Sequence, residues 1–113
     1  MSTRAPANFP SPETEPKAYA GRHFMDERKD AQEYSGFTFE FCTFEKIGIR
    51  NAKFTHCVFK HCEFKDCYMV GARFEHCSFL GSYFERCNFS WAEFPSSQLD
   101  YTRFYQCAPI LVT

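Results

Sequence analysis

The sequence predicts an all-β repeat fold in which short extended segments alternate with corners. A large apolar residue recurs at every fifth position from Phe39 to Phe104, and a smaller residue lies two positions before most of them. Side chains two apart on a strand point to the same side, so both residues of a repeat face one interior. A period of five residues differs from the helical period of about 3.6 residues. It also differs from the period of about two residues of a long flat strand. The chain must therefore turn after every short strand.

The two inward positions of the repeat predict the core. The large position holds fourteen residues, of which eleven are phenylalanine. All seven cysteines occupy the small position, where alanine, serine and threonine also occur, and a buried thiol packs as a small hydrophobic group. We therefore assign the cysteines to packing. The predicted core comprises Phe39, Phe44, Phe54, Phe59, Phe64, Phe74, Phe79, Phe84, Phe89, Phe94, Phe104, Cys57, Cys62, Cys67, Cys77 and Cys87.

The repeats resemble those of the pentapeptide-repeat family, in units such as AKFTH, CVFKH, CEFKD and ARFEH. The resemblance extends from Phe37 to Cys107 and implies the family's fold, a right-handed quadrilateral parallel β-helix with four repeats to a coil. Such a coil requires residues twenty apart to be alike. Alanine indeed stands at 52, 72 and 92, and cysteine at 67, 87 and 107. The array amounts to about 3.5 coils, close to the minimum for a stable solenoid.

The chain divides into four segments. Residues 1–18 hold four of the six prolines, which predicts a disordered arm. Residues 19–36 keep the period imperfectly and form either a degenerate first coil or a short helix that caps the solenoid. Residues 37–107 are the β-helix. Residues 108–113 follow without a polar capping segment, so this end either pairs with a second copy or is cut from a longer protein.

Composition argues against several classes of protein. Lys and Arg number 13 against 14 Asp and Glu, a balance that disfavours nucleic acid as a partner. No apolar run reaches the roughly 18 residues of a transmembrane helix, so no membrane insertion is predicted. The N-terminus lacks the apolar core of a signal peptide, which predicts a cytoplasmic location with reduced thiols.

No arrangement of residues predicts catalysis or a bound cofactor. The sequence has no nucleophile elbow, phosphate-binding loop or metalloprotease motif. Cysteines five apart lack the spacing of a zinc site. His56 and His76 are expected to stack one coil apart, but two ligands on an open face do not complete a zinc site. We therefore predict no enzyme activity, no cofactor and no metal.

Exposed aromatic residues supply the remaining hypothesis. Leu80, Tyr83 and Tyr101 are predicted to converge on one edge, with Trp91 and Tyr105 as further contact residues, because Tyr and Trp favour interaction hot spots. The prediction is a non-catalytic protein–protein interaction or scaffold module whose partner is unknown, with a homodimer through the C-terminal end as one form.

The family resemblance offers an alternative function. Qnr quinolone-resistance proteins resemble B-DNA in shape and charge and bind DNA gyrase. Such mimicry needs an acidic surface, whereas residues 37–113 contain eight Lys and Arg and eight Asp and Glu. A second alternative is a regulatory domain of a longer membrane or signalling protein.

Overall fold

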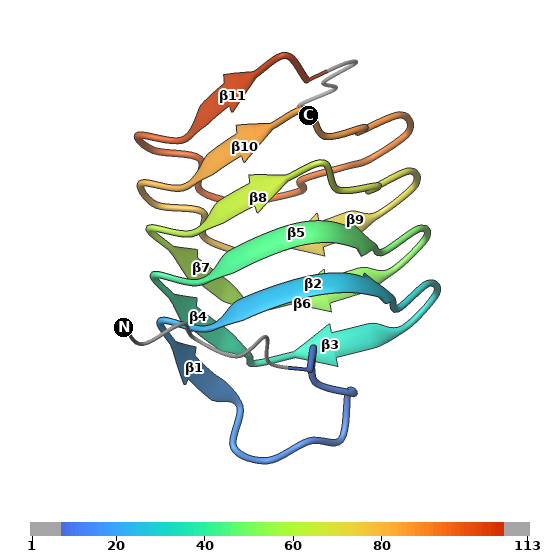
Figure 1. Cartoon of the computed structure of the whole chain (residues 1–113), viewed down its shortest axis with the longest axis vertical. Helices are drawn as coiled ribbons and strands as arrows, with labels where there is room; N and C mark the ends of the chain where they lie inside the picture. Colours follow the sequence, from blue (N-terminus) through green and yellow to red (C-terminus); the bar gives the residue numbers. More distant parts are fainter. Residues whose placement is uncertain (1–7, 108–113) are drawn as a thin grey trace.

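The computed structural model describes residues 8–107, which form a parallel β-solenoid of about four turns (Figure 1). Strands on successive coils pair with residues twenty apart in register, as Phe44 does with Phe64. The described residues contain no helix, and therefore none that could cross a membrane. The predicted all-β solenoid is confirmed.

Three faces of the solenoid carry parallel sheets. The first contains β1 (Ala18–Ala20), β4 (Thr38–Glu40) and β7 (Val58–Lys60). The second contains β2 (His23–Arg28), β5 (Thr43–Gly48), β8 (Glu63–Lys65), β10 (Tyr83–Glu85) and β11 (Arg103–Tyr105). The third contains β3 (Glu33–Ser35), β6 (Lys53–Thr55) and β9 (Arg73–Glu75). On the fourth face, single parallel bridges join Gly48, Tyr68 and Asn88.

Corners recur because every fifth residue adopts a left-handed backbone. The non-glycine residues at these corners have φ between 51° and 62°. Such a conformation disfavours most side chains, and Gly, Asn, Asp and His tolerate it best. The corner position holds Gly71 and Gly81, but also Lys46, Arg86 and Trp91. The parallel ladders and the stacked core therefore hold these residues in a backbone conformation that they disfavour intrinsically.

Stacked phenylalanine rings fill the interior. In the longest column, Phe44, Phe64, Phe84 and Phe104 stack with ring centroids 4.5, 4.5 and 5.1 Å apart. Rings of adjacent faces meet edge to face, the arrangement that aromatic quadrupoles favour. Of the sixteen residues assigned to the core, fifteen are buried, and Phe104 is half-buried in the last described coil.

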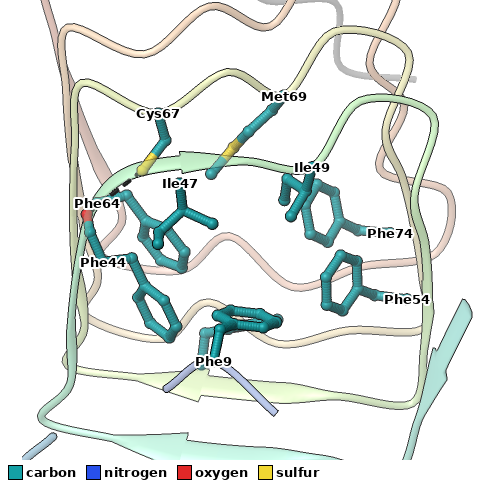
Figure 2. Close-up of a pocket in the computed structure, with 10 residues that line it drawn as sticks. Phe9, Phe44, Ile47, Ile49, Phe54, Phe64, Cys67, Met69 and Phe74 are labelled. Carbon is teal, nitrogen blue, oxygen red and sulfur yellow. Dashed lines mark hydrogen bonds between the residues drawn. The ribbon is translucent and has the colours of Figure 1, made fainter. Parts of the chain in front are cut away.

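The fourth inner column departs from phenylalanine. It holds Ile49, Met69 and Phe89, and Ile47 takes the neighbouring small position. Figure 2 shows Ile47, Ile49 and Met69 lying across the interior from Phe9. The apolar side chains there enclose a cavity of about 10 Å³. This volume is at the lower limit for a single water molecule, so the cavity is a packing defect and no ligand site.

The thiols and hydroxyls at the small position all make the same type of hydrogen bond. Each donates to the backbone carbonyl of the large residue 23 positions earlier. The Cys67 thiol lies 3.3 Å from the Phe44 oxygen (Figure 2), and the Ser82 hydroxyl lies 2.8 Å from the Phe59 oxygen. The Ser82 oxygen also accepts the backbone N–H of Cys62 at 3.1 Å. Cysteine, serine and threonine therefore substitute for one another because each supplies a small donor.

We predict that Ser82→Ala destabilises the protein by about 1–3 kcal/mol, since it leaves the Phe59 carbonyl and the Cys62 amide without their partner. Ser82→Cys keeps the donor and is expected to cost much less. Urea unfolding followed by circular dichroism measures both variants. Equal losses for the two substitutions would show that the hydrogen bond contributes nothing.

Residues 19–36 form a degenerate first coil, not a helix. Most of β1 and all of β2 and β3 lie in this range and pair with β4, β5 and β6. Phe24 and Tyr34 are buried at inward positions, whereas Arg22 and Gln32 are exposed where small residues would otherwise point inward. The interior of this coil therefore lacks its own small residues.

The segment before this coil differs from the predicted disordered arm. Residues 1–7 lie outside the described residues, but Phe9 is only 4% exposed and belongs to the core. Its ring contacts Phe24, Tyr34, Phe39 and Phe44 at centroid distances of 5.5 to 6.1 Å. Phe9 thus caps the N-terminal end of the solenoid from outside the repeat. The predicted end at 108–113 also lies outside the described residues.

Candidate interaction surface

The exposed aromatic side chains concentrate at corners. Trp91 is 79% exposed, Tyr101 85% and Phe41 64%, and all three have left-handed φ values. The residue after each corner takes the inward small position, as Cys42 and Ala92 do, and the corner side chain itself projects outward. Phe41 is not among the surface residues predicted from the sequence. It lies two residues after the inward Phe39 and outside the five-residue period of the core, and this position identifies it as a surface residue.

One corner column forms a partly stacked aromatic ladder, which we call the aromatic corner: Phe41, His61, Gly81 and Tyr101. The rings of Phe41 and His61 stack with centroids 5.1 Å apart. The His61 ring leans over Gly81, where a Cβ atom would approach the His61 Nδ1 atom to 2.5 Å. Gly81 thus makes room for His61, and Tyr101 stands unstacked on the next coil among the described residues.

The structure brings together part of the predicted contact set. Leu80 and Tyr83 are half-buried on either side of Gly81, and Tyr101 occupies the same corner one coil later. Tyr105 is exposed on β11, whose Arg103 pairs with Tyr83. Leu80, Tyr83 and Tyr101 therefore share one edge near the C-terminal coils, whereas Tyr105 pairs with Glu85 at the other end of β11, next to the corner at Gln106.

Trp91 is separate from this edge. It belongs to the corner column that contains Asn51 and Gly71, two corners away from the aromatic corner on the four-sided coil. The structure therefore does not group Trp91 with Tyr101.

Some charged side chains on the outer faces form ion pairs with the opposite sign. Arg73 binds Glu75 at 2.9 Å and also reaches Glu93 on the next coil. Arg86 donates to both oxygens of Asp66, at 2.8 and 3.2 Å. These hydrogen bonds from Arg86 lower the pKa of Asp66, and that from Arg73 lowers the pKa of Glu75. The paired charges produce a mixed surface.

The cysteines are free thiols, and all but the half-buried Cys107 are buried. In the stacked pair Cys67 and Cys87, the neighbouring thiol and burial both raise the pKa of Cys87. The thiols of this pair donate to the carbonyl oxygens of Phe44 and Phe64, at 3.3 and 3.4 Å. The burial and hydrogen bonding of these residues support a role in packing.

The two corner histidines stack as expected. The rings of His56 and His76 lie 5.0 Å apart and are nearly parallel. They line an open groove with Val58, Ser96 and Gln98. Parallel stacked rings aim their nitrogen lone pairs alongside each other instead of at one point. Within residues 8–107, no group of three His, Cys, Asp or Glu side chains is placed to hold a metal ion.

Comparisons with known proteins agree with the repeat pattern. A family model described as the pentapeptide repeat region matches residues 37–108. Rfr23, a pentapeptide repeat protein of the cyanobacterium Cyanothece 51142 with a known crystal structure, aligns with 80% of this chain over 83% of its own, at 12% identity and a TM-score of 0.35. A comparison with curated protein sequences finds no match. Because the family model covers more than half of the chain, the protein belongs to the pentapeptide-repeat family.

Proposed function

We propose that the protein is a non-catalytic protein-binding module whose contact surface is the edge formed by Leu80, Tyr83 and Tyr101. The observation that carries this proposal is the 85% exposure of Tyr101 at the end of the aromatic corner. An exposed tyrosine beside half-buried apolar groups is typical of an interaction hot spot. The pentapeptide-repeat family is, in addition, a structural repeat fold that is generally non-catalytic.

The solenoid supports binding by holding its outer residues at fixed spacing. The ladder sets the separation between residues twenty apart, and the buried phenylalanine columns prevent the faces from deforming. A surface that is already ordered loses little conformational entropy when a partner binds. Rigid display is therefore the proposed mechanism, and a cytoplasmic location, where the seven thiols stay reduced, accompanies it.

The experiment compares two triple variants in pull-downs from the host lysate. The test variant is Leu80→Glu/Tyr83→Glu/Tyr101→Glu. The matched control places the same three charges around the next corner, as His56→Glu/Ser96→Glu/Gln98→Glu. A partner retained by the wild type and the control but lost from the test variant supports the proposal. A partner lost equally from both variants, or none retained by the wild type, contradicts it.

Sedimentation of the purified protein distinguishes a second copy from a different partner. A wild-type dimer that becomes a monomer in the test variant identifies the partner as another copy of this chain. The alternative of gyrase binding is tested in a supercoiling assay with and without quinolone. The mixed charge of the described faces supports the expectation of no effect at micromolar protein.

A further inference from the structure

A second surface feature is a basic notch on the fourth face, next to the ends of β2 and β5. Arg28, Lys46, Gly48, Arg50 and Tyr68 line it, and its volume is about 310 Å³. Pockets that bind small molecules begin at about this size. The notch differs from the groove beside His56 because three of its five lining residues are cations. Its position does not involve the residues of the proposed protein-binding edge.

The notch exists because a glycine interrupts an outer column. Arg28, Gly48 and Tyr68 occupy the same register position on three successive coils. Gly48 has no side chain and is itself buried, and the Arg28 stem lies across it, with Cγ 3.4 Å from where a Cβ would stand. A larger residue at position 48 would push Arg28 aside and fill the notch.

The neighbouring groups hold two of the cations in place. Arg28 binds the Asp30 carboxylate at 2.8 Å, and the other Asp30 oxygen accepts the Arg50 backbone N–H at 3.0 Å. The Arg50 guanidinium lies 5.6 Å from the centre of the Tyr68 ring, a cation–π contact. Asp30 therefore neutralises Arg28 and joins it to Arg50, and Tyr68 orients the free guanidinium.

Two positive charges are left without a carboxylate partner. Among the described residues, no carboxylate oxygen lies within 4 Å of the side-chain nitrogens of Lys46 or Arg50. Asp26 and Asp66 are the nearest acidic residues in the corner column of Lys46, one coil on either side. Asp66 is already bound by Arg86 through two hydrogen bonds. The three cations and Asp30 give the notch a formal charge of +2.

We propose that this notch binds a phosphate group. At neutral pH a phosphate monoester carries a charge of about −1.5 to −2, which matches the unpaired charge of the notch. A guanidinium offers paired N–H donors to phosphate oxygens, and a lysine adds a point charge. Tyr68 supplies an aromatic surface next to the cations, where an organic group attached to the phosphate would lie.

The test is an NMR titration of the ¹⁵N-labelled full chain with inorganic phosphate and with AMP, at constant ionic strength set with chloride. The expected result is a saturable shift of the Gly48, Arg50 and Tyr68 amide signals in the millimolar range. Arg50→Gln and Lys46→Gln are each expected to weaken binding about tenfold, because each removes a charge-assisted contact. Asp26→Asn, which removes a neighbouring negative charge, is expected to tighten it.

Arg103→Gln is the matched control, since Arg103 is an exposed arginine on β11 that makes no ion pair among the described residues. It should leave binding unchanged. AMP that binds more tightly than phosphate, with the gain lost in Tyr68→Ala, identifies a phosphorylated organic ligand. Equal affinities identify the free anion. Shifts that do not saturate, or that fall equally in the Arg50 and Arg103 variants, overturn the proposal.

Discussion

Phe74→Asp is expected to unfold the protein, because it places a carboxylate inside a stacked column of the buried core. The Phe74 ring is fully buried between Phe54 and Phe94, each 5.1 Å away. Within residues 8–107 no cationic side chain is buried in this interior, so the carboxylate would be buried without a partner. The cost of burying this charge and the loss of ring packing together amount to most of the free energy of unfolding of a domain of this size, which is roughly 5–15 kcal/mol.

The adjacent residue provides the control. Glu75 points outward, and Glu75→Lys removes its ion pairs with Arg73 and Lys53 without disturbing the interior. This variant is expected to stay folded with a small loss of stability. Circular dichroism and resistance to proteolysis measure both variants after refolding from urea. If the two variants were equally tolerated, the inward assignment of Phe74 would be wrong.

Phe9→Ala is expected to have the second-largest effect, about 3–5 kcal/mol for the truncation of a buried aromatic ring. The change removes the ring that fills the first coil. The Phe9 backbone N–H donates to the Glu27 carboxylate at 2.7 Å, and the Tyr34 hydroxyl donates to the Pro10 carbonyl at 3.0 Å. Without the Phe9 ring, these two hydrogen bonds would lose the packing that keeps their donors and acceptors in place.

The expected loss is local, because each coil of a solenoid contacts only its neighbours. Hydrogen exchange should therefore accelerate in β1, β2 and β3 but change little in β8 and β10. Phe41→Ala is the matched control, since it truncates the same side chain at an exposed corner, and it should have a small effect. Uniformly faster exchange in Phe9→Ala would show that the first coil and the rest unfold together.

The repeat could be predicted from the sequence because its information is local and redundant. Every coil repeats the same inward and outward positions, so one departure such as Met69 does not obscure the phase. The stacking of His56 on His76 followed from the same spacing of twenty. The edge near Tyr101 was also predictable in outline, because its members are fixed by the register.

Other features depended on contacts that no period encodes. Phe9 stands alone among prolines, and nothing near it indicates that its ring packs against Phe44, 35 residues away. The basic notch depends on Gly48 in an outer column. Arg28 lies on the preceding coil, and Lys46 and Arg50 lie on either side of Gly48. Side-chain reach and ion pairing, such as that of Arg28 with Asp30, decide whether such residues converge.

The sequence by itself therefore determined the family, the β-solenoid and the residues that fill it. This was possible because every repeat has the same pattern of inward and outward positions. Only the tertiary structure decided how the first coil is capped and which outer residues meet. A cap is made once, by a segment outside the repeat. Outer side chains are long and flexible, and their positions are set by neighbours on other coils.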